Sequence, residues 1–353
     1  MVPAAAVAAF VAAGARPAER GEFTRRAVLN GKMDLLQAEA TADLIDAGSP
    51  AQRRSALHQL ERGLSGRLGA LRQELLDLEG LIAYDIDFPE EDEGPVSPAR
   101  LERAWRLVRD RLARLVATAP EGERLREGAL LVIAGRPNAG KSSLFNALLG
   151  AERAIVTDIP GTTRDAIEAH AVIEGFPFRL VDTAGLRASD DRVEKLGIEV
   201  AQRYLGAADL VLFCRDAEAD EFSAAPGTPV VEVVTKRDLA DRPTARPPDR
   251  LSVSVVTGAG LDTLRRRLAE VAFGRLLALG EVEPVVTRAR HRAALERALA
   301  EVESFWTART AGVDAVAAAT HLRAAVAALD DLIGVVTPDD VLDRVFATFC
   351  VGK

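Results

Sequence analysis

One eight-residue segment constrains the fold of this chain more than any other. Residues 135–142 read GRPNAGKS, and an apolar run from Ala129 to Ala134 comes directly before them. The segment fits the pattern G-x-x-x-x-G-K-[ST], in which backbone N–H groups and a lysine surround phosphate groups and a hydroxyl can bind Mg²⁺. The motif requires a strand before it and a helix after it, and residues 143–149 have a helical pattern. We therefore expect a nucleotide-binding domain that begins near residue 128.

Further short apolar runs follow this phosphate loop and predict a mostly parallel sheet. They span residues 178–181, 210–213 and 230–234 and alternate with helical segments. Strands and helices that alternate in this way are typical of a doubly wound α/β domain. The sequence predicts that this domain covers residues 128–275.

Helical periodicity dominates on both sides of the α/β domain. Apolar residues recur in steps of three and four from residue 57 to residue 82, which predicts one long helix with a packing stripe. Residues 32–127 and 276–353 are expected to form two parts of one all-α domain, and residues 1–31 a separate N-terminal segment. The predicted fold is thus an α/β P-loop domain inserted into an all-α helical domain.

Composition excludes several other kinds of site. None of the 353 residues lies in an apolar run near the ~18 residues that a membrane span needs, so we expect a cytoplasmic protein with no membrane segment. The two cysteines, Cys214 and Cys350, give no disulfide framework, and the four histidines show no metal-ligand spacing. A net charge of −8 argues against a broad RNA-binding surface. Any contact with RNA is therefore expected to be local or shared with a partner.

A second motif, DTAG at residues 182–185, follows the predicted strand at 178–181. At the carboxyl end of a strand, Asp182 can hold the water shell of Mg²⁺ and Gly185 can meet the γ-phosphate. The next residue is Leu186 and not the glutamine that positions water in Ras-like enzymes, so hydrolysis must be arranged differently.

A third motif, TKRD at residues 235–238, follows the predicted strand at 230–234. The Asp238 carboxylate can accept two hydrogen bonds from the guanine edge while the Lys236 stem covers the ring, which selects GTP over ATP. Thr235 stands where asparagine is usual, and we expect it to weaken base recognition. The segment that would close over the base, SVVTG from Ser254, departs from the usual Ser-Ala.

Between the first two motifs, residues 157–165 read TDIPGTTRD and occupy the place of a first switch. Thr163 is the threonine expected to close on Mg²⁺ when γ-phosphate is present, together with the Ser142 hydroxyl. The remaining residues expected to contact GTP are Asn138, Ala139, Gly140, Lys141 and Ser143 in the phosphate loop, Thr157, Asp158, Ile159, Pro160, Gly161 and Thr162 in the switch, and Thr183 and Ala184 in the second motif.

With these motifs in hand, the chain resembles the MnmE (TrmE) family of tRNA-modification GTPases over nearly its whole length. The resemblance includes the segments around the three motifs and several outside the α/β domain. These outside segments are residues 21–26, 29–35, 37–40, 43–45, 87–92 and the terminal FCVGK at 349–353.

The resemblance implies a GTPase that is activated when K⁺ allows two G domains to pair in a homodimer. Asn138 would bind K⁺ together with backbone groups of Thr157, Ile159 and Thr162. The ion would then supply the positive charge that an arginine finger supplies elsewhere. Glu194 matches the residue that orients the attacking water through a second water.

The same resemblance implies a role in modifying tRNA. Members of the family work in a heterotetramer with a flavin-containing partner, MnmG/GidA, to build a carboxymethylaminomethyl group on the wobble uridine (U34), with a tetrahydrofolate as the one-carbon source. Cys350 matches the tail cysteine that this modification needs, and Lys32 and Lys353 match positions in the folate site. Residues 1–31 resemble only the last part of the family's folate-binding, dimer-forming domain. If these residues are the entire protein, we expect weak or absent folate binding and a GTPase rate that depends on protein concentration.

Three alternatives remain open. A ribosome-assembly GTPase of the Era/Der type would share most motifs, but it would carry a basic RNA-binding module in place of long flanking helices. A helical interaction protein with a vestigial nucleotide domain would not be expected to retain Lys141, Ser142, Asp182 and Glu194 together. A shortened homologue that keeps only GTP binding and hydrolysis is the third.

Overall fold

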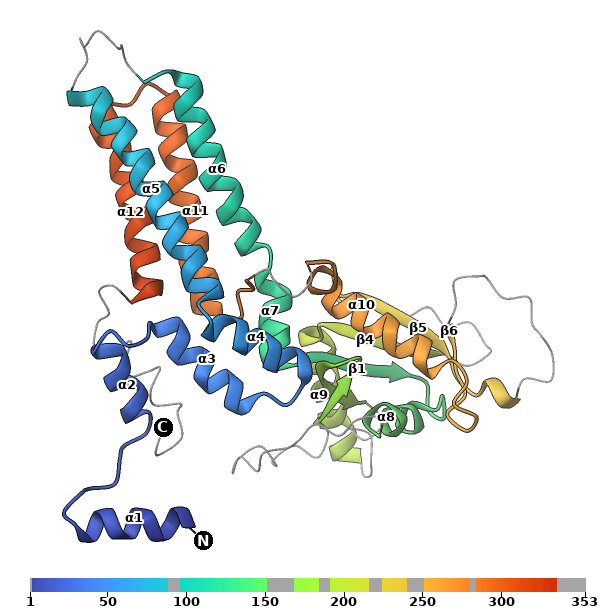
Figure 1. The fold of residues 1–353 in the computed structure, drawn as a ribbon. Helices are drawn as coiled ribbons and strands as arrows, with labels where there is room; N and C mark the ends of the chain where they lie inside the picture. Colours follow the sequence, from blue (N-terminus) through green and yellow to red (C-terminus); the bar gives the residue numbers. More distant parts are fainter. Residues whose placement is uncertain are drawn as a thin grey trace. The chain divides into compact units, whose positions relative to one another are not determined.

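The structure, a computed structural model, describes residues 2–87, 96–150, 168–183, 191–215, 224–239, 251–279 and 284–334; for residues 2, 3, 84–87 and 191–198 it describes the backbone alone. The chain divides into two compact units (Figure 1). The α/β unit lies within residues 46–54 and 118–283, and the helical unit within residues 1–45, 55–117 and 284–353. The α/β unit therefore interrupts the helical unit in sequence, as predicted.

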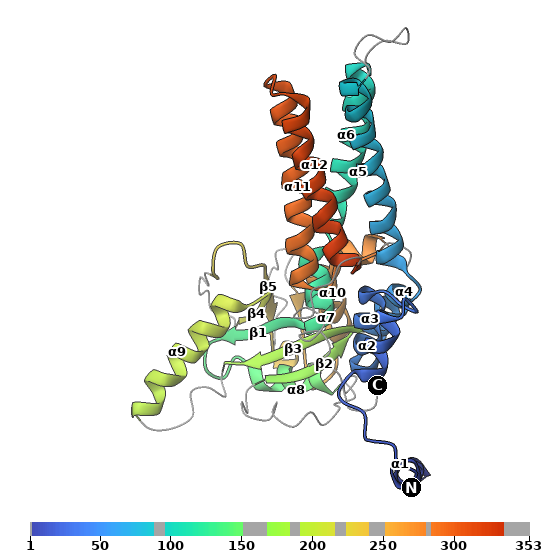
Figure 2. The ribbon, with the colours of Figure 1, turned by 90° about the vertical axis from the view of Figure 1, so that its left-hand side faces the viewer.

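The α/β unit is built on a six-stranded sheet with the strand order β2-β3-β1-β4-β5-β6. Only the pair β2–β3 is antiparallel, and the other neighbours are parallel. Glu174 and Gly175, both with positive φ, form the tight turn between β2 and β3. Figure 2 shows β3 between β1 and β2. The strands are β1 (Ala129–Gly135), β2 (Glu168–Ile173), β3 (Phe176–Asp182), β4 (Leu210–Arg215), β5 (Val230–Val234) and β6 (Leu251–Ser252).

Helices cover both faces of this sheet. Alternate residues of a strand point to opposite faces, so Leu131 and Ile133 lie in one core while Leu130 and Val132 lie in another. The first core is closed by α7 (Ala119–Glu127), α8 (Lys141–Leu149) and α10 (Leu261–Leu279), and the second by the end of α9 (Asp191–Ala207). A mostly parallel sheet buried on both faces confirms the predicted doubly wound fold.

Long helices pack side by side as a bundle in the helical unit (Figure 1). Helices α5 (Gly63–Asp87) and α11 (Ala289–Thr310) each pack against both α6 (Pro98–Val116) and α12 (Ala315–Ile333). Trp105 of α6 stacks on Trp306 of α11 at 4.5 Å between ring centroids and donates a hydrogen bond from Nε1 to the Val302 carbonyl at 3.0 Å. The smaller helices near the N-terminus are α1 (Val2–Ala12), α2 (Glu22–Leu29), α3 (Leu35–Asp46) and α4 (Pro50–Leu60). The single turn η2 (Arg237–Leu239) belongs to the α/β unit.

The single long helix predicted over residues 57–82 is wrong. The chain breaks between α4 and α5, where Arg62 adopts a φ of 67°. Gly63 then passes so close to His58 that a Cβ would lie 2.4 Å from its ring. Residues 64–82 still form the buried stripe of α5, but Leu57 is exposed. The apolar period continues across the break, so periodicity alone could not reveal it.

The α/β unit also takes in three segments that the sequence assigned to the helical domain, namely residues 46–54, residues 118–127 and the end of α10 at residues 276–279. In residues 46–54, the Ala51 N–H donates to the Gly175 carbonyl at 3.0 Å, and the Gln52 amide donates to the Arg126 carbonyl of α7 at 3.0 Å. Leu125 of α7 lies in the sheet core. The other domain limits stay a proposal.

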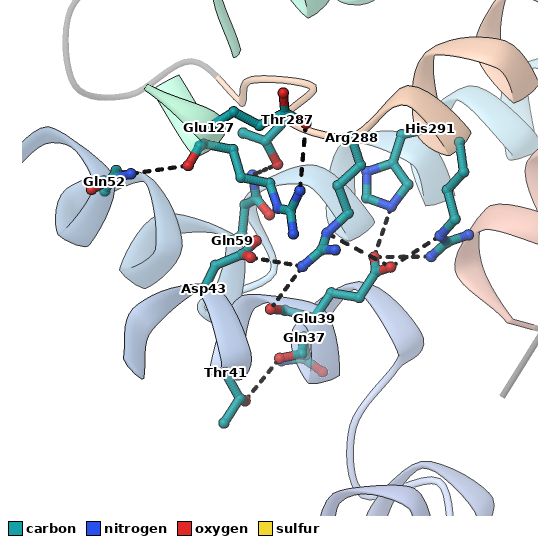
Figure 3. A network of polar contacts seen from close by, with 12 residues as sticks. Gln37, Glu39, Thr41, Asp43, Gln52, Gln59, Glu127, Thr287, Arg288 and His291 are labelled. Carbon is teal, nitrogen blue, oxygen red and sulfur yellow. Dashed lines mark hydrogen bonds and ion pairs between the residues drawn. The ribbon is translucent and has the colours of Figure 1, made fainter. Parts of the chain in front are cut away.

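A buried carboxylate joins α3 to the first turn of α11. Arg290 donates from Nε to Glu39 Oε1 at 3.0 Å and from Nη2 to Oε2 at 2.9 Å, and His291 Nε2 lies 2.7 Å from the same Oε2. Arg288 Nη2 donates to Asp43 Oδ1 at 2.7 Å. In Figure 3, Arg288 and His291 both point toward the Glu39 carboxylate. The positive end of the α11 dipole adds to this attraction.

In this network Glu39 is ionised and His291 is neutral. Burial would raise the pKa of Glu39, but the hydrogen bond with His291 and the nearby positive charges outweigh it and hold the pKa well below its usual range. Burial lowers the pKa of His291, which is therefore neutral and donates from Nε2. Its Nδ1 has no hydrogen-bond partner among the described residues, so a second ring proton would be unsatisfied.

Both shifts predict that acid destabilises the helical unit. A histidine with a lowered folded pKa stabilises fully above the ordinary value of 6.5 and loses that contribution as the pH falls below it. A glutamate with a lowered folded pKa likewise stabilises fully above its ordinary value of 4.5 and loses that contribution as the pH falls below it. The free energy of unfolding should therefore decrease in two steps below pH 6.5. Urea unfolding at several pH values checks this, because both tryptophans, Trp105 and Trp306, lie in the helical unit.

Glu39→Gln should cost about 3 kcal/mol at pH 7, since it leaves the partly buried Arg288 and Arg290 without this carboxylate and removes the charged acceptor of the buried His291. It should also flatten the pH dependence below 4.5. The matched control is Glu301→Gln, which removes a His321 partner at a half-exposed site and should cost less than about 1 kcal/mol. Equal stability and equal pH profiles for the two variants would contradict the role given to Glu39.

Candidate nucleotide-binding site

The segment between β1 and α8 makes a loop that few residue types could form. Gly135, Asn138 and Gly140 have positive φ values of 145°, 63° and 81°. A Cβ at Gly135 would lie 2.3 Å from the Cys214 carbonyl oxygen of β4, so only glycine fits there. The loop therefore turns sharply at the carboxyl end of β1 and runs into α8.

The start of α8 leaves donors available for an anion. Its N-cap is Gly140, so no side chain caps the helix, and the first N–H groups of an α-helix have no partner within it. Ser142 and Ser143 of this first turn are exposed. Such a turn, with its positive helix dipole, fits a phosphate group.

Lys141 adds a positive charge to this cradle. The side chain is buried, and its Nζ donates to the carbonyls of Gly135 at 2.9 Å and Arg136 at 2.7 Å, so it lies across the loop. The loop backbone itself thus orients the ammonium group. From this position the ammonium group can donate hydrogen bonds to the β- and γ-phosphates of a nucleotide.

Asp182 ends β3, in register with Ile133 of β1, and so lies at the same edge of the sheet as the loop. The next residue, Thr183, is buried and donates from its hydroxyl to the Ile133 carbonyl at 2.9 Å, which fixes the end of the strand. A hydroxyl and a carboxylate, Ser142 and Asp182, are oxygen ligands of the kind Mg²⁺ takes alongside substrate phosphates and water. The described residues hold no group of three or more His, Cys, Asp or Glu side chains that could bind a metal alone.

The base-reading segment is tied to the phosphate loop. The Thr235 hydroxyl donates to the Ala139 carbonyl at 2.7 Å, and Thr235 approaches Gly140 so closely that a Cβ there would touch it at 3.5 Å. The sequence indicated only that Thr235 weakens base recognition, whereas in the structure this residue holds the base-reading segment against the phosphate loop. Sequence reasoning missed it because the acceptor is a backbone oxygen 96 residues away.

Asp238 is held for recognition by a neighbour on the next loop. The buried Ser254 hydroxyl lies 2.6 Å from Asp238 Oδ1 and accepts the Thr257 N–H at 3.2 Å. With the Thr257 N–H donating to it, the Ser254 hydroxyl donates its own proton to the carboxylate. The atypical segment 254–258 therefore still orients the aspartate, while Lys236, at a φ of 57°, and Asp238 remain exposed.

Several predicted site residues cannot be placed in this geometry. The switch residues Thr157 to Thr163, together with Ala184, Gly185, Cys350 and Lys353, lie outside the described residues. Glu194 lies on α9, where the backbone alone is described. Lys32 is exposed in the turn between α2 and α3 of the helical unit, so the structure does not bring it together with the phosphate loop in one unit.

Cys214 has no chemical role at this site. Its thiol is buried at the end of β4, and burial raises its pKa to about 12, with Asp182 raising it further and Lys141 opposing. A thiol that stays protonated is neither a nucleophile nor a metal ligand. Its place is in the sheet core.

No helix within the described ranges combines the length and the apolar character that crossing a bilayer requires.

A family model described as the MnmE helical domain matches residues 35–350. Two relatives carry the name tRNA modification GTPase MnmE. The protein from Methylorubrum populi is 46% identical, and the match covers 96% of this chain and 76% of the relative. The protein from Geobacillus kaustophilus is 40% identical, with 97% and 77% covered.

Among solved structures, the G domain of the T. maritima FeoB iron transporter is 29% identical over 41% of this chain and 98% of that one, with a TM-score of 0.29. That score is too low to support an inference. The family model and the identities across three quarters of the relatives' length are sufficient: the chain belongs to the MnmE family of tRNA modification GTPases.

Proposed function

We propose that the α/β unit of this tRNA-modifying GTPase binds and hydrolyses GTP with Mg²⁺ and K⁺, in support of wobble-uridine modification. The observation that carries the GTP assignment is the contact between Ser254 and Asp238 at 2.6 Å. It orients an exposed carboxylate that can accept the two N–H donors of the guanine edge. An adenine edge offers no such pair, so this arrangement supports GTP over ATP.

The phosphate end of the nucleotide would be held by backbone donors of α8 and by Lys141. Ser142 and the switch residue Thr163 would bind Mg²⁺, with Asp182 holding its water shell. Bound there, Mg²⁺ neutralises charge on the phosphates. What the chain itself contributes is a fixed set of donors that need not reorganise during the reaction.

The K⁺ site would consist of the Asn138 side chain and backbone oxygens of Thr157, Ile159 and Thr162. Asn138 is exposed on the loop and adopts a positive φ, which supports an outward-facing role. Bound K⁺ supplies positive charge beside the phosphates. Glu194 would orient the attacking water, and two α/β units would face each other in a homodimer.

In tRNA modification, the chain would act with a flavin-containing MnmG/GidA-type partner on the wobble uridine of tRNA. Cys350 would take part in that chemistry, and Lys32 and Lys353 would contact a tetrahydrofolate. The exposure of Lys32 supports its access to a ligand. The remaining support is the match of these residues to the family.

GTP hydrolysis should be about tenfold faster in K⁺ than in Na⁺ at saturating GTP and Mg²⁺, because positive charge beside the transferred phosphoryl group stabilises the transition state. Asn138→Ala should remove the difference. Asn146→Ala, an exposed asparagine on the adjoining α8, is the control and should keep it. Steady-state rates in the two chloride salts measure this, and equal rates in wild-type protein would exclude a K⁺ site.

Glu194→Ala should reduce kcat at least about tenfold and leave the Kd for GTP nearly unchanged, since water positioning acts in the transition state. Glu199→Ala changes an exposed charge on the same helix and should have little effect on either quantity. Single-turnover hydrolysis and equilibrium binding separate the two. If Glu194→Ala loses affinity and rate together, the residue acts on folding or switching instead.

Asp238→Asn should lower the affinity for GTP about a hundredfold. The variant should bind xanthosine triphosphate better than GTP, because the amide can donate to the xanthine oxygen. Arg237→Ala, at the exposed neighbouring position, should keep the preference for GTP. Competition binding between the two nucleotides checks the reversal. An unchanged preference would show that the TKRD segment does not read the base.

A further inference from the structure

Helix α6 is strongly basic in a chain whose net charge is −8. It carries six arginines against two acidic residues, Glu102 and Asp110. A basic helix in an acidic protein is a local site of positive potential, of the kind that phosphate binding requires. The nucleotide site makes no use of it.

The packing of the bundle directs these arginines outward. The apolar face of α6 is buried and packs against α5 and α11. Its members are Leu101, Trp105, Val108, Leu112 and Leu115. The helical period of 3.6 then places most arginines on the opposite side. We call Arg100, Arg103, Arg106, Leu107 and Arg114, all exposed, the outer face of α6.

The two acidic residues of α6 are already paired with other arginines of the same helix. Arg109 binds Asp110 Oδ1 at 2.6 Å and stacks over the Trp105 ring at 4.6 Å. Arg106 pairs with Glu102, one helical turn away. On the side toward α5, Arg111 pairs with Glu74.

Three arginines of the outer face have no carboxylate partner within the described ranges of the chain. Arg100 and Arg103 make no side-chain contact with an acid there. Arg114 uses only its Nε, which donates to the Asp110 carbonyl at 3.3 Å. A solvated helix face more often carries alternating charges that pair at i,i+4, so an unpaired set of one sign favours an external anion.

We propose that the outer face of α6 binds the phosphate backbone of the RNA substrate. The guanidinium fork matches phosphate oxygens in two parallel hydrogen bonds. Arg100 and Arg114 are separated by about 21 Å along the helix axis, a length that spans several nucleotides. Leu107 lies between them and offers apolar contact to a ribose. The inference rests on the proposed function in one respect, namely that the substrate is a tRNA.

The test variant is Arg100→Glu/Arg103→Glu/Arg114→Glu. Its control, Arg266→Glu/Arg267→Glu/Arg297→Glu, changes the net charge equally at exposed positions elsewhere. Arg297 precedes Trp306, which faces α6, by two and a half turns and so lies on the other side of α11. A second test variant with glutamine at the same three α6 positions removes the charge without reversing it. Circular dichroism confirms that each variant is folded.

The Kd for an unmodified tRNA transcript is measured by fluorescence anisotropy across a KCl series. We expect the α6 glutamate variant to bind about tenfold or more weakly than wild-type protein, with the slope of log Kd against log salt reduced by about 2. The glutamine variant should show a smaller loss of the same kind. The control variant should bind within about threefold of wild-type protein, and GTP hydrolysis should be unchanged in all.

Each other outcome overturns the proposal. Unchanged RNA affinity of the α6 variants would assign this face to solvent or to an acidic protein partner. Equal losses in the α6 and control variants would show a response to net charge alone. If wild-type protein binds no tRNA, the proposal fails together with the tRNA part of the proposed function, whereas K⁺-dependent GTP hydrolysis would still be intact.

Discussion

The uncapped start of α8 is the feature on which the nucleotide site depends. A serine, threonine, asparagine or aspartate side chain at the N-cap often accepts hydrogen bonds from the first unpaired N–H groups of a helix. Here the N-cap is Gly140, and no side chain takes that role. The donors are therefore left to an anion, and the helix would be less stable without one. Gly135 makes the arrangement possible, because only glycine clears the Cys214 carbonyl and lets the chain turn into the helix.

Three hydroxyl groups hold the rest of the site around this turn. Thr183 bonds to β1 and fixes the strand end that carries Asp182; Thr235 bonds to the phosphate loop, and Ser254 bonds to Asp238. Each is a residue that supports the neighbour expected to contact the nucleotide. A site held in this way loses little freedom when a ligand binds, and preorganised donors are worth most in catalysis.

The sequence was sufficient wherever the signal is local. The strand before the phosphate loop, the helix after it, the place of Asp182 at the end of β3 and that of Asp238 shortly after β5 all follow from adjacent residues. The break at Arg62 did not follow, because the apolar stripe continues through it. The partners of Glu39 are about 250 residues away, and the acceptor of Thr235 is a backbone oxygen. Contacts of this kind carry no sequence pattern, so only the folded chain reveals them.

Arginines in the helical unit have two roles: those beside buried carboxylates stabilise the fold, and exposed ones are available to bind a ligand. Arg288 and Arg290 lie beside the buried Glu39, and removing a partner there would leave a charge whose desolvation is uncompensated. An exposed arginine has no such requirement, since water solvates it at little cost. Unpaired arginines can therefore persist only on the surface, and only those can bind a ligand without first breaking a contact. In a chain with a net charge of −8, the outer face of α6 has three such arginines on one helix.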